Sequence, residues 1–386
     1  MALAQTQTRS HGAQSVSDEP SNKNSDEDNK IKNTPKHARP KDSMKSTWRT
    51  KDRSQWNTYQ KILDRLGVHH VSLDRPVPRH PKSDKVPHLG QLSQHKWILF
   101  HGFIPLLLHQ LLVSLTGWRL TTPFAFHLYM VLFNWTVIRQ VHILRRLGHQ
   151  HGFLDGDAHD RDGVPDHAAG KVFWSLYKTV GARLFMMLLL TYHPDRSPLR
   201  DLARPAWWAL LPLRTGLYAV VLDFWFYLYH RCMHDVPFLW RFHRTHHLTK
   251  HPNPMLSAYA DEEQELFDMI VIPLLAWSTF WLAGHPLGFY DWWMCQQYVV
   301  YTEVWGHSGI RVHLAAPSSL SWLLSALGMD LCVEDHDMHH RKGWRRSHNY
   351  GKQTRVWDRL FGTCGERVES WDGNVDYDDQ AYMPLF

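Results

Sequence analysis

The segment Asp223-Phe-Trp-Phe-Tyr-Leu-Tyr-His-Arg-Cys-Met-His234 closes a long aromatic and apolar block that begins at Trp207. Only two charged side chains interrupt this block before its first histidine, so we expect one continuous helix. On a helix, the i,i+4 spacing of His230 and His234 places both imidazoles on one face. The segment therefore predicts an apolar helix whose end carries two side chains that suit a metal ion.

Other apolar blocks predict a membrane-embedded bundle around this helix. The stretch 97–117 contains no Asp, Glu, Lys or Arg, and its length approaches the ~20 residues that span a bilayer. Block 123–138 would bring the chain back to its starting side, and blocks 269–290 and 292–304 form a second returning pair. We therefore expect an all-α, integral-membrane helical bundle with about four transmembrane helices.

Charged residues place the remaining segments relative to this bundle. Lys178 and Arg183 interrupt the segment 172–192, which predicts an interfacial or partly buried amphipathic helix. The arginines between 139 and 146 follow the first returning pair and indicate that this side faces the cytosol. Because each pair of blocks returns, histidines before residue 250 and after residue 330 can meet there, in a cytosolic helical cap.

The composition separates a polar tail from this membrane domain. Residues 1–90 are expected to be a disordered or poorly ordered tail, and residues 91–386 a membrane-embedded domain. The net charge of +6 comes without a nucleic-acid-binding motif, so we expect no nucleic-acid partner. Four cysteines without a C-x-x-C pair exclude a disulfide scaffold. Histidine is unusually abundant, with 29 of 386 residues, and requires a chemical explanation.

Two further histidine groups repeat one pattern, H-x-x-H-H. They are His243-Arg-Thr-His-His247 and His336-Asp-Met-His-His340. Together with the first pair they supply eight imidazoles, at positions His230, His234, His243, His246, His247, His336, His339 and His340. Because one zinc ion takes about four ligands, eight histidines predict two metal sites. Neither H-E-x-x-H nor a paired Glu-x-x-His pattern is present, so the ligands are predicted to be nitrogen-rich.

These three groups, their order and the surrounding apolar blocks resemble the fatty acid hydroxylase and sterol desaturase superfamily of integral-membrane di-iron oxygenases. The resemblance covers roughly residues 207–363. Asp335-His-Asp-Met-His-His340, Asn349-Tyr-Gly351 and Trp357-Asp-Arg-Leu-Phe-Gly-Thr363 are similar to the end of the family's domain. The latter two motifs favour the sterol desaturase branch.

The resemblance implies a chemistry that the residues alone do not specify. It implies two iron ions and O2 as co-substrate, with hydroxylation or desaturation of a lipid that is a sterol, fatty acyl, sphingoid or terpenoid compound. It also implies external electrons, from cytochrome b5 and an NADPH-dependent reductase at the cytosolic face of the endoplasmic reticulum. The basic run 341–346 could dock such a donor or face lipid headgroups. Family members supply a further histidine between the second and third groups, for which His307 and His313 are candidates.

Carboxylates near the histidines are candidate acceptors for the second N–H of a metal-binding imidazole. The candidates are Asp223, Asp235, Glu303, Glu334 and Asp335. Two other classes of protein remain open at this point. A zinc-dependent integral-membrane hydrolase acting on a lipid would work without O2 or an electron donor. A membrane protein that stores or transports metal would place its ligands along a pore, which the returning helix pairs disfavour.

Overall fold

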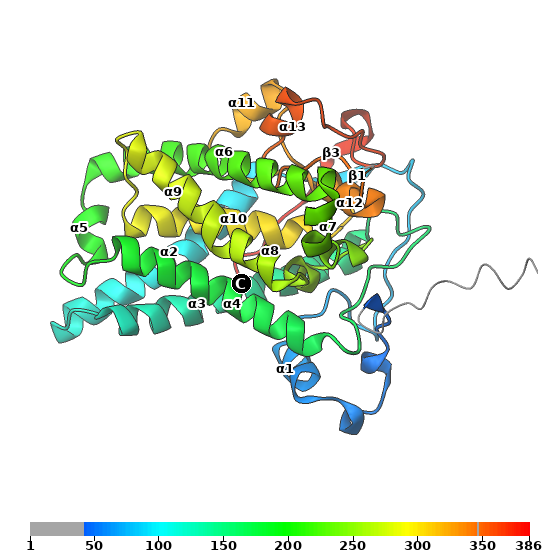
Figure 1. Ribbon diagram of the computed structural model, residues 1–386, viewed down its shortest axis with the longest axis horizontal. Coiled ribbons are helices and arrows are strands. Elements are labelled where there is room, and N and C mark those ends of the chain that lie inside the picture. Colours follow the sequence, from blue (N-terminus) through cyan, green and yellow to red (C-terminus); the bar gives the residue numbers. More distant parts are fainter. Residues whose placement is uncertain (1–41, 346) are drawn as a thin grey trace, which may run out of the picture. The chain divides into compact units, whose positions relative to one another are not determined.

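The computed structural model describes residues 42–345 and 347–386, and the expected tail before residue 42 lies outside these described residues. Long helices run side by side in alternating directions in this part of the chain (Figure 1). They are α2 (Gln91–Thr116), α3 (Thr122–His151), α4 (Ala169–Thr191), α6 (Pro205–Asp235), α9 (Ile272–Leu282) and α10 (Phe289–Gly306). Helix α10 contacts α2, α3, α4 and α6, so it forms the centre of the bundle. The expected all-α fold is confirmed.

Because the helices alternate in direction, the connections between them lie at two ends of the bundle, and these ends differ in character. At one end, short connections and α5 (Pro198–Leu202) are held by tyrosines, since Tyr192 donates a hydrogen bond to the carbonyl of Leu120 and Tyr290 to that of Arg196. At the other end lie short helices. These are α7 (Pro237–His243), the 3-10 helices η5 (His246–Leu248) and η6 (Pro254–Ala258), α8 (Glu262–Leu266) and α12 (Val333–Lys342). Three of them, α7, η5 and α12, carry histidines. Other short α-helices are α1 (Thr58–Leu66), α11 (Ser321–Ala326) and α13 (Val356–Leu360).

A small parallel sheet ties segments that are distant in sequence to the histidine end. Strand β1 (Val86–Leu89) lies between β2 (His313–Leu314) and β3 (Val375–Ala381). In this register His88 pairs with His313. The sheet connects the start of α2 to the segment that follows α10 and to the C-terminal region.

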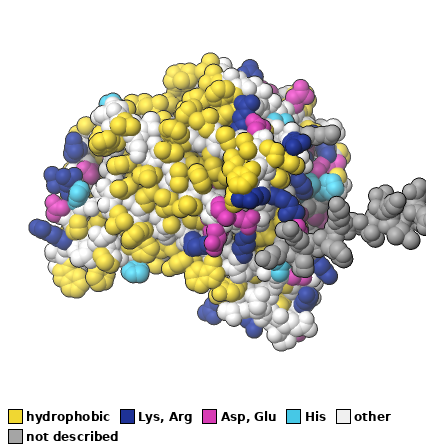
Figure 2. Space-filling view, in the orientation of Figure 1, with side chains coloured by type: hydrophobic (Ala, Val, Ile, Leu, Met, Phe, Trp, Pro, Cys, Tyr) yellow, Lys and Arg dark blue, Asp and Glu magenta, His cyan; other side chains and the backbone are white. Residues whose placement is uncertain are grey.

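Four helical segments are long and apolar enough to cross a membrane: Gln91–Thr116, Ala169–Thr191, Pro205–Asp235 and Glu262–Leu282. Their outward faces carry exposed leucines and aromatics, such as Leu111 on α2 and Phe185 on α4, and Figure 2 shows apolar side chains spread over this face. Such a continuous apolar surface suits a lipid environment. The chain is a multi-pass membrane protein.

The set of candidate spans differs from the expected one at α3, which contains the expected crossing 123–138 and is not among the candidates, and at α4. Its two charged residues, which predicted an interfacial helix, are directed at protein groups. Lys178 lies 2.8 Å from the Glu265 carboxylate, and Arg183 donates a hydrogen bond of 2.9 Å to the main-chain carbonyl of Asp268. Conversely, the expected crossing at 292–304 belongs to α10, whose side chains are almost all buried inside the bundle. Apolar composition alone does not distinguish these two environments.

Residues 42–90 are ordered, although we expected them to belong to the polar tail. Trp48, Leu63 and Val68 are buried against the main core. The Asp166 carboxylate accepts hydrogen bonds from the main-chain N–H groups of Thr47 and Trp48. A few well-spaced apolar side chains suffice here because the membrane domain supplies the surface that covers them.

Candidate metal centre

Nine of the ten histidines proposed from the sequence come together in two buried groups. The first group consists of His230, His234, His243, His247 and His339, and the second of His246, His307, His336 and His340. Within each group, one nitrogen of every ring lies within 4.8 Å of those of the others. This is the distance range in which several imidazoles can share one ion.

Local helix geometry explains which histidine joins which group. His230 and His234, one turn apart, both point from the end of α6 into the first group. The adjacent histidines of the H-x-x-H-H motifs separate, because neighbouring side chains on a helix point about 100° apart. His247 and His339 therefore enter the first group, while His246 and His340 enter the second. Each motif thus contributes to both groups.

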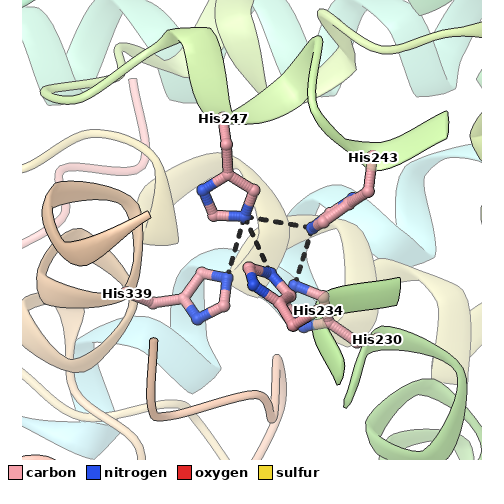
Figure 3. Close-up of side chains that lie close together, drawn as sticks. All are labelled: His230, His234, His243, His247 and His339. Atoms are coloured by element: carbon pink, nitrogen blue, oxygen red, sulfur yellow. Dashed lines mark hydrogen bonds between the residues drawn. The ribbon is translucent and has the colours of Figure 1, made fainter. Parts of the chain in front are cut away.

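Distances in the first group fit a shared cation (Figure 3). The Nε2 atom of His247 lies 3.0 Å from that of His243 and 3.1 Å from those of His234 and His339. The Nε2 atoms of His230 and His243 are 3.0 Å apart. Two nitrogens bound at about 2.1 Å to one ion, at right angles to each other, would be about 3.0 Å apart.

Hydrogen bonds on the outer side of the rings show that these contacts cannot all be hydrogen bonds. His230 Nδ1 donates to the Tyr350 carbonyl at 2.7 Å, and His243 Nδ1 donates to Gln264 Oε1 at 2.9 Å. Each of these neutral rings has only one proton, so both Nε2 atoms carry a lone pair. Two lone pairs 3.0 Å apart repel each other unless a cation lies between them. The donor set therefore fits a metal ion.

The second group has the same construction. His307 Nδ1 donates to the carbonyl of Glu303 at 2.9 Å, and His340 Nδ1 donates to that of Thr249 at 3.0 Å. The Nε2 atom of His307 then faces those of His336 at 3.1 Å and His246 at 3.4 Å. His340 Nε2 is buried and has no hydrogen-bond partner among the described residues. This group also fits a cation.

Burial keeps these imidazoles in the form that binds metal. It lowers the pKa of His243 to about 3 and the pKa of His307 to about 4. Both rings are therefore neutral near pH 7, and neutral imidazole is the form that ligates metal ions.

His313, the tenth candidate, lies outside both groups. It is in β2, where its ring stacks on that of His88 with 5.9 Å between ring centres. The sharp turn at Ser308-Gly309 leads the chain away from the second group and into the sheet, so the two candidate histidines separate.

Of the five carboxylates proposed as imidazole partners, only Glu303 lies beside one. Its main-chain carbonyl accepts from His307, and its carboxylate lies 4.0 Å from the same ring. Asp223 and Glu334 instead accept hydrogen bonds from main-chain N–H groups of 352–354 and 368–370. Asp335 pairs with Arg367, and Asp235 pairs with Arg231 on the surface. These four carboxylates therefore stabilise the surrounding structure and do not orient an imidazole.

Most acceptors that orient the imidazoles are main-chain carbonyls, which a sequence does not mark. Side chains also contact the outer nitrogens: Gln264 accepts from His243, and the Ser347 hydroxyl lies 2.9 Å from His339 Nδ1. Gln264 was missed. It is a buried amide on α8, inside the acidic run Asp261-Glu-Glu-Gln-Glu265. An amide just before the apolar block that begins at residue 269, close in sequence to the histidine motif 243–247, is the signal that could have identified it.

A third set, Asp155, His159 and His251, also has metal-binding spacing. Burial opposes ionisation of Asp155, but hydrogen bonds from Lys82 and His251 lower its pKa to about 2. The negative charge of Asp155 is thus already compensated by these neighbours.

Arg341 also lies 3.6 Å from the Asp155 carboxylate, so this arginine is not available to an outside partner. Lys342 and Arg345, by contrast, are exposed.

A mainly apolar pocket lies between the helices, and one of its wall residues, Phe226, contacts the ring of His230 in the first group. Its walls include Phe133, Met187, Leu222 and Trp293 from four different helices. Glu303, one turn before His307, also lines it. A helical membrane protein with buried histidine groups able to hold metal ions, beside a pocket suited to an apolar molecule, is the class that the fold and the site define.

Comparison with known proteins identifies the family. A model of the fatty acid hydroxylase family matches residues 215–363. The chain is 46% identical over 316 residues to the fatty acid hydroxylase vlmA of Lecanicillium sp, which covers 80% of this chain and 86% of that protein. It is 25% identical over 143 residues to the alkylglycerol monooxygenase of Xenopus tropicalis, or 37% of this chain and 28% of that protein. No solved structure matches it.

This chain belongs to the fatty acid hydroxylase family, as the resemblance of its histidine motifs predicted. The members of this family are metal-dependent oxygenases. The chain is accordingly an oxidoreductase that acts on a lipid.

Proposed function

We propose that the protein hydroxylates an unactivated C–H bond of a lipid, using O2, two iron ions and electrons from another protein. The observation that carries this proposal is the division of nine buried imidazoles into two adjacent groups. An all-nitrogen donor set suits iron, zinc, copper or nickel, but redox-inert zinc cannot activate O2. The two relatives are named a hydroxylase and a monooxygenase of lipids, which favours hydroxylation over desaturation.

In this proposal the first group would hold one ion and the second group the other, with His313 outside the ligand set. When bound, the two irons would supply the reduction of O2 and the removal of hydrogen from the C–H bond. The chain itself fixes the imidazoles. The carbonyls of Tyr350 and Thr249 hold the protons of His230 and His340 on Nδ1, so that Nε2 is free to bind.

The remaining components of the proposal concern location and electron supply. The arginines at 139, 145 and 146 lie towards the histidine end of α3, which supports a cytosolic orientation of the site. We infer residence in the endoplasmic reticulum, with electrons from cytochrome b5 and its NADPH-dependent reductase. The exposed Lys342 and Arg345 are suitable contacts for an acidic donor.

Metal and oxygen dependence test the proposal directly. The purified full chain should contain about two iron ions, and it should convert members of a panel of fatty acyl, alkyl, sterol and sphingoid lipids only with O2 and an electron donor. A protein that binds one zinc ion and keeps its full activity without O2 would refute the oxygenase and favour the hydrolase. Oxidation of a sterol would instead favour the sterol desaturase branch, as the two C-terminal motifs do.

A further inference from the structure

The pocket beside the histidines contains a cluster of charged side chains in otherwise apolar surroundings. Arg183 comes from α4, Asp268 from the π-helix η7 (Phe267–Val271), Glu303 from α10 and Lys352 from the loop before α13. Ionisable residues in membrane-embedded helices are costly, and they usually serve a site. A π-helix is itself a feature that occurs frequently at functional sites.

This cluster is connected to both histidine groups. Gln264 bridges Asp268, at 3.3 Å, and His243 of the first group, at 2.9 Å. Glu303 is joined to His307 of the second group through its main-chain carbonyl. The polar end of the pocket therefore lies next to the place where the lipid would be oxidised, and the apolar walls continue away from it.

Two members of the cluster have incomplete hydrogen bonds: among the described residues, neither Arg183 Nε nor Asp268 Oδ1 has a partner. Lys352 is matched by Glu303 at 2.9 Å and by Asp268 at 3.7 Å. Arg183 contacts Asp268 only through the main-chain carbonyl, and its guanidinium forms no ion pair with a described carboxylate. The side chain is only 9% exposed, and its Nε has no partner among the described residues.

An orphan donor of this kind indicates the chemistry of the missing partner. A buried N–H without an acceptor is destabilising, and an acceptor on a bound molecule would remove this cost. Of the described residues that line the pocket, Asp268 and Gln296 each have an acceptor oxygen without a partner, and Arg183 supplies the orphan donor. This donor calls for a lipid that carries an oxygen atom. Glu265, which also lines the pocket, is paired with Lys178. The other two carboxylates balance the two cations of the cluster, so a neutral carbonyl fits as well as a carboxylate does.

We propose that Arg183 is a positioning residue, whose Nε donates a hydrogen bond to the acyl oxygen of the lipid substrate and so determines which carbon lies beside the histidines. This inference rests on the proposed function and narrows its substrate to fatty acids or their esters. The oxidised carbon is then fixed by its distance from the acyl group, whatever the length of the rest of the chain.

Binding tests this inference independently of oxidation. The full-length protein in lipid nanodiscs is loaded with a fluorescent fatty acid, which palmitic acid, methyl palmitate and hexadecane then displace. A charge-assisted hydrogen bond predicts that hexadecane binds about 10- to 100-fold more weakly than the acyl compounds. Equal binding of hexadecane and both acyl compounds would refute the proposal. This comparison uses the unaltered chain.

Substitution of the arginine sharpens the test. Arg183→Met should weaken palmitic acid and methyl palmitate about 10- to 100-fold and leave hexadecane unchanged. Arg200→Met, the same change on the exposed helix α5, should alter none of the three. An effect on the free acid alone would identify a carboxylate as the ligand, and an effect on both would identify a carbonyl. Unchanged affinity of both acyl compounds for Arg183→Met would refute the role of this residue.

Product analysis provides the readout that a purely structural residue would not change. With fatty acids of increasing length, the hydroxyl group should stay at a constant number of carbons from the acyl group. Arg183→Met should broaden the products to several positions. A hydroxyl position counted from the methyl end would contradict the proposal. Selective acyl binding by a protein that oxidises none of these lipids would instead refute the proposed function and leave the acyl site standing.

Discussion

Replacement of Gln264 by leucine tests whether the hydrogen bonds around the histidines tune metal binding. Gln264 is 1% exposed, and its Oε1 accepts the Nδ1 proton of His243 at 2.9 Å. Leucine has a similar size but no acceptor, so the ring of His243 would lose its fixed proton and orientation. Loss of such an outer partner typically lowers metal affinity 10- to 100-fold, or about 1.4–2.7 kcal/mol.

The structure predicts that this loss is confined to one ion. His243 belongs to the first group, whereas His307 and His340 in the second group use the carbonyls of Glu303 and Thr249. Titration of the iron-loaded protein with a chelator should therefore release one ion about 10- to 100-fold more readily in Gln264→Leu, and the other as in the unaltered protein.

A matched substitution separates this effect from a general loss of packing. Gln297 is likewise buried, but it lies on α10 and its Nε2 has no partner among the described residues. Gln297→Leu should therefore retain both ions with unchanged affinity. The reasoning is refuted if Gln264→Leu binds both ions as the unaltered protein does, or if both ions weaken equally.

Four further substitutions, one of them a control, distinguish metal-binding from structural roles. His339→Ala should lower the iron content and abolish lipid oxidation, while the exposed loop variant His285→Ala should retain both; equal loss in the two variants would contradict the assignment. His313→Ala should keep its iron, as measured by metal analysis, because this residue lies in β2; loss of an ion would restore it as a ligand. Asp223→Ala should lower the free energy of unfolding by at least about 3 kcal/mol, because three main-chain N–H groups lose their acceptor; an unchanged melting temperature would refute this.

The sequence was most informative where chemistry depends on local spacing. The i,i+4 pair of His230 and His234 required only that α6 be a helix, and the apolar block before it made this prediction secure. The distinction between His307 and His313 was beyond local reasoning, because a turn at Ser308-Gly309 and pairing with β1 remove His313 from the site. Such long-range pairing leaves no periodic signal in a short strand.

Hydropathy was least informative where a helix is polar on its protein-facing side. Helix α4 was predicted to be interfacial because of Lys178 and Arg183, yet both side chains are turned towards protein groups. A charge lowers the average hydropathy of a segment equally whether it faces water or a partner inside the bundle. Arg183 is one of the two charged residues that concealed this candidate membrane span. It is also the residue that we propose positions the substrate.

The repeated H-x-x-H-H motif also explains why the two groups act together in the proposed reaction. His246 and His247 are neighbours, as are His339 and His340, and each pair contributes one ring to either group. Because neighbouring Cα atoms are only about 3.8 Å apart, the backbone holds the groups together at two separate points. Two independent metal sites would not need such shared segments, whereas a reaction in which two ions act on one O2 molecule requires them to stay close. The order of the histidines along the chain is thus itself an argument for a two-metal centre.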